Sequence, residues 1–510
     1  MREIEKDLIA RLVDGVKEQV RQHLLGLPLQ EVASLDRVEE MTRELAHRMG
    51  EGVFAVWAQV LEEVSITLAG QCPGCGKARK VKRRASAPMQ VSVLGMMLSV
   101  PKPYLECDCE VPGVSIVRVL TGLSSGDKSG ELELMAAYCA AEHSYGKASR
   151  DLEVHHGQLV ERTAVRRMAL EVEQDALEFA ESERRELLEQ VGQEQRREGK
   201  ARLMLQGDGG TVRTGQMEPC GRGDPGCGKT TPKTGRPRRK RPTQYREIIT
   251  LDVREPGEAT ASALDVVVPS AAPEGERARR MLALAARKGL GDNTEVFGLG
   301  DMGSSLPSSF DEAFVGYTAL YSADWKHTYD YVDKASAHLR GERPERWVKA
   351  MKDALWERNR PKADKLIERA RQRRVADLPP HLEKCPVQTL ATYIDNNWDR
   401  LHAKAFKEQG LDFVSARAES QVRDRTKSRY AVPGAWKQEN LEGKAVLRSV
   451  IADCRWPAFR EHYLHTKQRR HRAGLSTRVH AAIAKGQLAP TCLDQLDTAP
   501  PATEAHAKAA

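Results

Sequence analysis

The sequence predicts a multidomain protein of mixed α/β class. Its 510 residues provide for roughly two to four domains. Hydrophobic residues make up 40% of the chain and charged residues 30%, so packed cores with strongly charged surfaces are expected. Long segments with helical periodicity alternate with short apolar runs, and both patterns occur in the same central region.

The cellular location follows from what the chain lacks. No run approaches the roughly 20 apolar residues that a membrane-spanning helix needs. The first residues, MREIEKDLIARL, are charged and amphipathic, without the apolar core of a signal peptide. We therefore expect a cytoplasmic protein that does not bind membranes.

Residues 1–67 are predicted to be helical, because apolar residues recur at helical spacing. Residues 68–112 change character, with short alternating stretches typical of strands and two close cysteine pairs. The sulfur atoms of Cys72, Cys75, Cys107 and Cys109 are the ligand type and number that a tetrahedral structural Zn²⁺ requires. The sequence thus predicts a zinc-ribbon-like module, the alternative being unrelated buried or redox cysteines.

Residues 128–198 are predicted to form a helix-turn-helix followed by a connecting helix. One helix covers ELELMAAYCAAEHSYGKASRDL, the chain breaks around HHG, and a second helix opens on Thr, Arg and Arg. Two helices joined by a short polar turn are typical of this DNA-binding motif, although helix pairs are also common without that function.

Residues 201–324 are predicted to contain five strands. The runs LMLQGD, YREIITLDV and SALDVVV form the first three, and an amphipathic helix, ERARRMLALAARKGL, follows them. TEVFGLGD and YTALYSAD are the fourth and fifth, with a helical turn or short loop between them. The first and fourth strands are predicted to end in Asp208 and Asp301, and helices dominate from there to about residue 480.

A nucleotide-binding pattern occurs in GDPGCGKTT at 223–231, which matches G-x-x-x-x-G-K-[ST]. A working P-loop needs a strand directly before it and a helix directly after it. The preceding TGQMEPCGR is no strand, and the prolines and glycine of TPKTGRPRRKRP prevent a helix. We therefore predict that the match binds no ATP. Cys220 and Cys227 could mark a small metal or redox loop, but two ligands do not make a site.

The same loop is strongly basic, with eight Lys or Arg and no acid between Lys229 and Arg246. A second basic cluster is KQRRHR at 467–472, within a basic C-terminal segment at 466–510 whose tail is predicted to be disordered. Basic runs are often solvated surface, but they also neutralise nucleic-acid phosphates. The residues predicted to bind DNA here are Arg236, Arg238, Arg239, Lys240 and Arg241.

Asp208 and Asp301 are candidate metal ligands. Taken singly, an Asp beside glycines, as in GDGG and GDMG, is a turn residue. Two of them at matched strand ends, with an acid from a later helix, are the parts of a two-metal phosphoryl-transfer site. Carboxylates suit the hard cations Mg²⁺ and Mn²⁺, whereas Cys or His would favour zinc.

The chain from about 200 to 465 resembles DDE-type insertion-sequence transposases of the ISKra/ISLre-like branch. The segments that carry the resemblance are GDGGTV at 207–212, GLGDMG at 298–303, DWKHTYDYV at 324–332, YIDNNWDRL at 393–401 and SARAESQVRDRTKSRYAVPGAWKQENLEGKAVLRSVIADCRW at 415–456.

The resemblance implies an RNase H-like catalytic domain at 200–465 with a helical insertion at about 333–390. It implies that Asp208, Asp301 and Glu419 are catalytic and hold two Mg²⁺ or Mn²⁺ ions. Hydrolysis at the end of the element would free a 3′-hydroxyl, which then attacks target DNA. Glu408 and Asp412 are the alternatives for the third acid.

Further residues follow from the same resemblance. Arg423, Lys427 and Trp436 come after the catalytic Glu and are expected to contact DNA. Asp324 and His327, just past the fifth strand, are expected to support the site, with structural hydrogen bonding as the alternative.

The expected partner is double-stranded DNA, both transposon ends and target, bound by a nucleoid-associated homo-oligomer without ATP. The alternatives are an RNase H-like nuclease without strand transfer, a catalytically inert zinc-containing DNA-binding regulator and, more distantly, an ATPase that assists transposition.

Overall fold

The structure is a computed structural model with mixed α/β architecture. It describes residues 10, 14, 17–18, 21, 35–81, 88–93, 95–123, 126–192, 198–215, 218–220, 239–240, 244–258, 263–267, 275–302, 305–337, 339, 344–373, 385–416, 420 and 438–490. The chain divides into two compact units, the first formed by Met1–Ala169 with Arg460–Ala510 and the second by Leu170–Phe459.

The first unit begins with a long helix and two small sheets. Helix α2 (Leu35–Ala69) is followed by strands β1 (Lys80–Val81), β2 (Met89–Val93), β3 (Met96–Val100) and β4 (Leu105–Glu106). β1 pairs with β4, and β2 pairs with β3, both antiparallel. The short strands predicted between 68 and 112 are therefore confirmed, as two separate ladders.

Four helices of the first unit follow these sheets: α3 (Ile116–Thr121), α4 (Gly130–Glu142), α5 (Tyr145–His156) and the start of α6 (Arg162–Val191). The single helix predicted over 131–152 is wrong, because it is broken between α4 and α5. Ser144 interrupts it: its backbone is extended, and its side chain accepts a hydrogen bond from the Lys147 N–H at 3.3 Å, capping α5. The break around HHG is confirmed, since α5 ends at Gly157 with φ of 60°.

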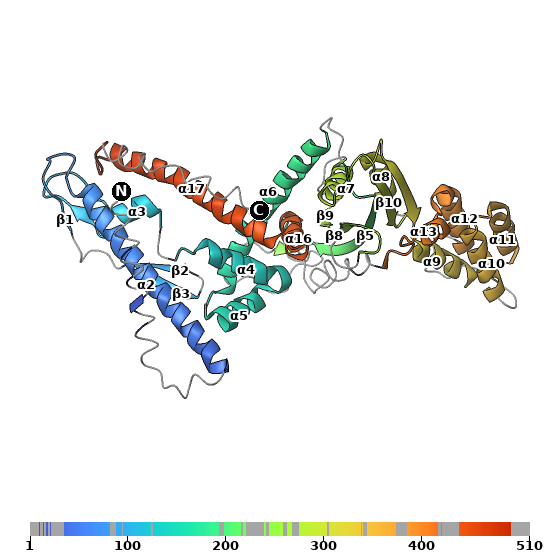
Figure 1. Ribbon diagram of the computed structural model, residues 1–510, viewed down its shortest axis with the longest axis horizontal. Coiled ribbons are helices and arrows are strands. Elements are labelled where there is room, and N and C mark those ends of the chain that lie inside the picture. The colour runs from blue at the N-terminus through green and yellow to red at the C-terminus, as the bar shows by residue number, and fades with distance from the viewer. Residues whose placement is uncertain are drawn as a thin grey trace. The chain divides into compact units, whose positions relative to one another are not determined.

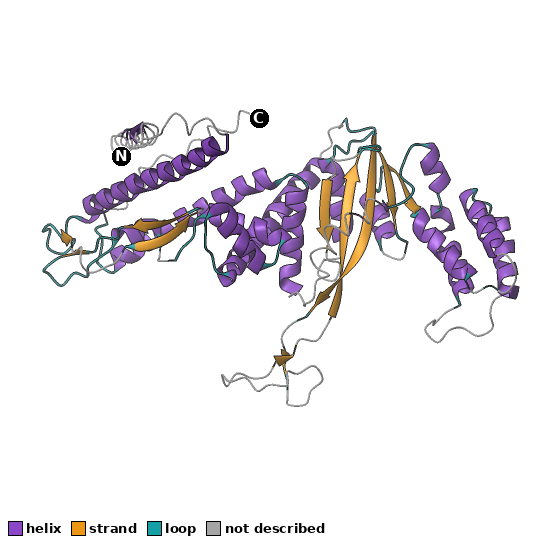
Figure 2. Cartoon of the chain, turned by 90° about the horizontal axis from the view of Figure 1, so that it is seen from below, coloured by secondary structure: helices purple, strands orange, loops and turns teal. Residues whose placement is uncertain are grey.

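The second unit is built on a five-stranded mixed sheet, drawn in orange in Figure 2. Its strands are β5 (Arg202–Thr214), β8 (Gln244–Arg254), β9 (Ala263–Val267), β10 (Glu295–Gly300) and β11 (Thr318–Ala323). The order is β11-β10-β5-β8-β9. β5, β8 and β9 are antiparallel neighbours, whereas β10 runs parallel to both β5 and β11.

All five predicted strands are present, but the predicted end of the first is wrong. β5 does not stop at Asp208, because its antiparallel ladder with β8 continues to the pair Thr214↔Gln244. Beyond that ladder, β6 (Glu218–Pro219) pairs with β7 (Arg239–Lys240). The connection between the first two strands thus emerges from a long hairpin.

The two faces of the sheet carry different cores. Helices α7 (Glu276–Arg287) and α8 (Leu306–Ala313) pack on the face that presents Leu203, Leu205 and Leu251. On the opposite face, Met204, Phe297 and Leu299 pack against α13 (Ala403–Glu408) and the loop after it, and Val212 and Ile248 pack against α16 (Gln438–Ala452).

The region predicted as a helical insertion is helical and has its own core. It contains α9 (Trp325–Ser336), α10 (Pro344–Trp356), α11 (Arg360–Arg373) and α12 (Pro386–Asn397), which Figure 1 draws in yellow to orange. Their buried residues form one cluster that extends from Ala323 to Ala403.

The last helix, α17 (Trp456–Ala484), contains residue 465, where the sequence predicted a domain boundary. Among the described helices, none combines the length and the apolar character that crossing a bilayer demands.

Candidate active site and cysteine cluster

Three aspartates lie in a row across neighbouring strands of the second unit. Gly207 of β5 pairs with Gly300 of β10, and Gly300 pairs with Ala323 of β11. Asp208, Asp301 and Asp324 are the residues that directly follow these three partners. Because side chains alternate along strands, the first two project from the same face as Met204 and Phe297. Asp208 and Asp301 therefore lie side by side on neighbouring strands, but Asp208 lies within its strand and not at the strand end that was predicted.

The interpretation of GDGG as a turn is wrong, because β5 continues through it to Thr214. The glycines of GLGD, before Asp301, allow close packing. A Cβ on Gly300 would lie 2.6 Å from the Tyr321 hydroxyl oxygen and 2.7 Å from the Gly207 carbonyl oxygen. A Cβ on Gly298 would lie 2.4 Å from the Tyr321 ring. The small residues of GLGD thus leave room for a buried tyrosine beneath the site.

Asp301 is accompanied by a histidine. His327 Nδ1 lies 3.6 Å from Asp301 Oδ1, and both side chains are about one-third exposed. The pKa of His327 is raised, first by its close contact with the Asp301 carboxylate and then by the negative charges of Asp324, Asp301 and Asp208, against the effect of burial. The three carboxylates therefore act together on one imidazole and favour its cationic form.

Asp324 is buried and uses both of its carboxylate oxygens. Oδ1 accepts hydrogen bonds from the backbone N–H groups of Lys326 at 2.6 Å and His327 at 3.2 Å, which caps α9. Oδ2 accepts from the backbone N–H of Ser415 at 2.6 Å and also from its hydroxyl. In addition, the Trp325 N–H donates to the Phe413 carbonyl at 3.0 Å. Asp324 thus fastens the segment around Ser415 to the end of β11.

Glu419, the predicted third acid, lies outside the described residues, four positions after Ser415. The described residues on either side of it both pack on the Asp208 face. Leu411 joins the cluster of Met204 and Leu299, and Leu441 joins that of Val212 and Ile248. Asp208 lies between Met204 and Val212 on β5, so Leu411 and Leu441 pack on either side of its position along the strand.

The two alternative third acids have other partners. Asp412 forms an ion pair with Arg254, and its Oδ2 accepts a hydrogen bond from Gln206 Nε2 at 2.7 Å. Glu408 is exposed and lies 4.0 Å from Lys404 on its own helix. Ser415 and Arg254 were not expected from the sequence, because each meets an acid more than 90 positions away and no local pattern signals such a contact.

Most of the predicted DNA-binding residues are not described. Arg239 and Lys240 lie in β7. The P-loop match at 223–230, which includes Cys227, lies outside the described residues. So do the other six residues predicted to bind DNA: Arg236, Arg238, Arg241, Arg423, Lys427 and Trp436.

The four cysteines of the first unit come together as predicted. Gly76 donates its N–H to the Cys72 carbonyl at 2.9 Å, which closes a tight turn around Cys75. The pairing of β1 with β4 brings Cys107 and Cys109, which follow β4, next to Cys72 and Cys75. Cys72 Sγ lies 3.4 Å from Cys109 Sγ, and Cys75 Sγ lies 3.4 Å from Cys107 Sγ.

This cluster can hold a metal ion such as zinc. All four sulfur atoms lie within 4.8 Å of one another. Burial opposes the thiolate of Cys72, but the backbone N–H groups of Cys75 and Gly74 overcome it and lower the pKa of Cys72 to about 6. Metals bind the thiolate, so this shift favours coordination by Cys72, whereas hydrogen bonds to neighbouring thiols of the cluster raise the pKa of Cys75 and Cys109. Within the described parts of the chain, no other group of three or more Cys, His, Asp or Glu is as close together.

Comparison with known proteins places the chain in no family: no family model matches it, and no curated protein matches it significantly.

Proposed function

We propose that the protein is a DDE transposase that cuts the ends of its own insertion sequence and joins them to target DNA. The observation that carries this proposal is the placement of Asp208 and Asp301 on adjacent strands, where their parallel pairing ends. The Asp324–Ser415 contact supports it further, because it holds the start of the Glu419 segment at the same end of the sheet.

An RNase H-like fold of the second unit is part of the proposal. Three antiparallel strands are followed in sequence by two parallel strands, with a helix before each of the last two. This arrangement matches the strand sequence and pairing expected of that fold, and the helical region after β11 occupies the position of the insertion that the resemblance implies.

The donor atoms fit Mg²⁺ or Mn²⁺. Asp208 and Asp301 offer carboxylate oxygens, which hard divalent cations prefer, and Glu419 would complete the set. Two such ions, when bound, would activate the attacking oxygen and stabilise the leaving oxygen of the phosphodiester. Asp301 is held beside His327, and this contact orients its carboxylate.

The first unit is proposed to bind DNA and a structural zinc ion. The four cysteines supply the number of thiolate ligands that a structural zinc ion takes, and the two-residue strands next to them are too short to form a core alone. Helices α5 and α6 form the helix-turn-helix of the proposal, since Arg162, Arg166 and Arg167 are exposed at the start of α6. The protein would act on double-stranded DNA as a nucleoid-associated homo-oligomer in the cytoplasm, without ATP.

The decisive experiment is cleavage of DNA carrying the flanks of the gene, with Mg²⁺ and mapping of strand breaks. Asp208→Asn, Asp301→Asn and Glu419→Gln should each abolish cleavage and strand transfer, while end binding stays nearly intact. Double variants should lose little more, because the acids act as a unit.

Asp292→Asn is the matched control, because Asp292 is exposed and lies in the turn before β10, at the opposite end of that strand from Asp301. It should cut normally. Normal cleavage by all three acid variants would refute the site. Normal cleavage by Glu419→Gln alone, with loss in Asp412→Asn, would move the third acid to Asp412.

A further inference from the structure

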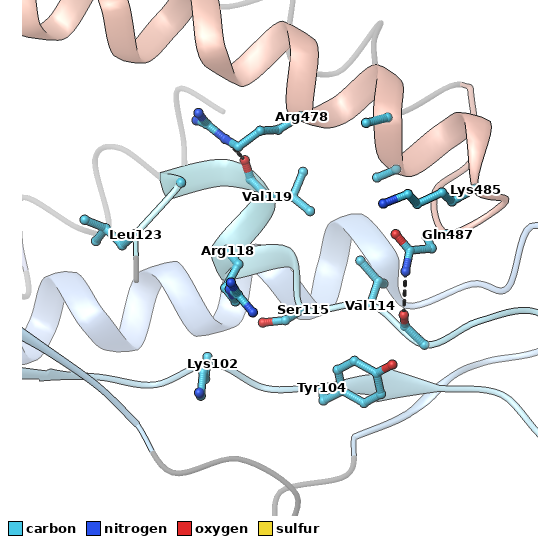
Figure 3. Close-up of a pocket in the computed structure, with 14 residues that line it drawn as sticks. Lys102, Tyr104, Val114, Ser115, Arg118, Val119, Leu123, Arg478, Lys485 and Gln487 are labelled. Atoms are coloured by element: carbon cyan, nitrogen blue, oxygen red, sulfur yellow. Dashed lines mark hydrogen bonds between the residues drawn. The ribbon is translucent and has the colours of Figure 1, made fainter. Parts of the chain in front are cut away.

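A basic cavity of about 510 Å³ lies in the first unit, near the cysteine cluster in the sequence but separate from it. Its wall comes from the β3–β4 connection, helix α3 and the C-terminal part of α17 (Figure 3). Beneath it lies an apolar cluster that includes Val114, Ile116 and Ala482. The volume falls within the range of roughly 300–1,000 Å³ typical of ligand pockets.

Of the described residues that line this cavity, none is acidic and four are cations: Lys102, Arg118, Arg478 and Lys485. These cations come from three separate parts of the chain, so folding brings their positive charges together. Figure 3 shows Arg118 on α3, Arg478 on α17 and Lys485 in the turn that follows α17. Among the described residues, none forms an ion pair with Arg118, Arg478 or Lys485, although ion pairs are common elsewhere in the chain.

Arg478 is held in place by neutral groups. Its Nε donates to the Val119 carbonyl at 2.9 Å, and its guanidinium lies over Gly122, where a Cβ would come within 2.8 Å of it. Burial lowers the pKa of Arg478. The fold therefore keeps a partly desolvated cation at the cavity, where an anion would be bound more strongly than at an exposed site.

The Ser115 hydroxyl at the cavity also lacks a hydrogen-bond partner among the described residues. Ser115 lines the cavity and precedes α3, but its side chain forms no capping hydrogen bond. Its Oγ is buried and has no hydrogen-bond partner in the described parts of the chain. A buried hydroxyl without a partner is costly, and an anionic oxygen in the cavity would accept a hydrogen bond from it.

We propose that this cavity binds a phosphate group, and, resting on the proposed transposase function, that the phosphate belongs to the DNA backbone. Two guanidinium groups, two ammonium groups and a hydroxyl are all hydrogen-bond donors suited to phosphate oxygens. The apolar floor and the few neutral side chains offer little to distinguish bases. The site would therefore position a duplex without reading its sequence.

The first test measures duplex DNA affinity against salt concentration. Arg118→Gln/Lys485→Gln changes two exposed cations of the cavity, so the fold should be retained. If each cation neutralises one phosphate, the slope of log affinity against log salt should fall by about 1.8, equally for any sequence. Lys362→Gln/Lys365→Gln makes the same charge change on exposed residues of α11 and should keep the wild-type slope.

The second test measures the thermal shift caused by inorganic pyrophosphate, and it does not depend on DNA binding. A stabilisation of the wild type that the cavity variant lacks, without any change in the DNA slope, would assign the cavity to a free phosphate compound. Equal slopes in all three proteins together with no specific pyrophosphate shift would overturn the proposal. If the wild type bound no duplex, the transposase function would fail and the pyrophosphate result alone would decide on the cavity.

Discussion

The contact between Asp324 and Ser415 makes a quantitative prediction that separates stability from catalysis. Asp324→Ala removes the side-chain cap of α9, which costs about 1 kcal/mol. It also leaves the N–H and hydroxyl of Ser415 without their acceptor at a position only 5% exposed, which costs about 1–3 kcal/mol more. We expect the free energy of unfolding of the second unit to fall by about 2–4 kcal/mol.

Ser415→Ala removes only the hydroxyl half of the contact and keeps the backbone hydrogen bond. The chain should stay folded, with a loss of about 1–2 kcal/mol. Cleavage should nevertheless fall by about 10- to 100-fold, because Ser415 fixes the start of the segment that carries Glu419 and small displacements of catalytic groups are costly. Ser336→Ala, on the exposed end of α9, is the control and should change stability by less than about 0.5 kcal/mol.

Urea unfolding of the single and double variants gives the coupling energy between the two residues, and cleavage of end DNA gives the activity. We expect Asp324→Ala and Ser415→Ala to be non-additive by about 1 kcal/mol. Additivity within about 0.3 kcal/mol would show that the contact contributes nothing to stability. Full cleavage activity in Ser415→Ala would refute the positioning argument.

Three further changes test other parts of the structure. Cys72→Ser should reduce bound zinc, measured by elemental analysis, from about one ion per chain to none and unfold the small β1–β4 module; finding no zinc in the wild type would contradict the assignment. Gly300→Ala should lower the unfolding free energy by more than 2 kcal/mol, since its Cβ would lie 2.7 Å from the Gly207 carbonyl oxygen, as chemical denaturation can check. Lys444→Met should cost about 3–5 kcal/mol by leaving buried Glu173 without the ammonium group 2.7 Å away, and the double change with Glu173→Leu should recover most of that loss.

The sequence predicted the strands of the second unit well because each is a short apolar run bounded by breakers. It did not predict where β5 ends. GDGG looks like a turn, and only the partner strand β8, more than 30 residues later, shows that the ladder continues. The break before α5 was also missed, since Ser144 is a weak signal within an otherwise helical pattern.

The candidate site was predictable where it depends on local sequence and unpredictable where it depends on distant contacts. Asp208 and Asp301 stand out because each follows a strand-like run, and the four cysteines stand out by their spacing. The roles of Asp324 and Ser415 come from a hydrogen bond across 91 positions, which no periodicity reveals. Likewise, the basic cavity combines α3 with α17, and the hydrogen bond between Arg478 and Val119 that joins them spans 359 positions.

The parallel pairing of β5 with β10 ends at Gly207, so the two halves of β5 are expected to differ in stiffness. Up to that residue the strand is hydrogen-bonded on both sides, by β10 and by β8; beyond it, in the described sheet, only β8 remains. Amide hydrogen exchange should therefore quicken within a few residues of Asp208. Asp208 is the first residue beyond the doubly hydrogen-bonded half, so its backbone stays anchored next to that half. The hairpin farther along can bend, in the proposed function to follow a bound duplex, without displacing the acid.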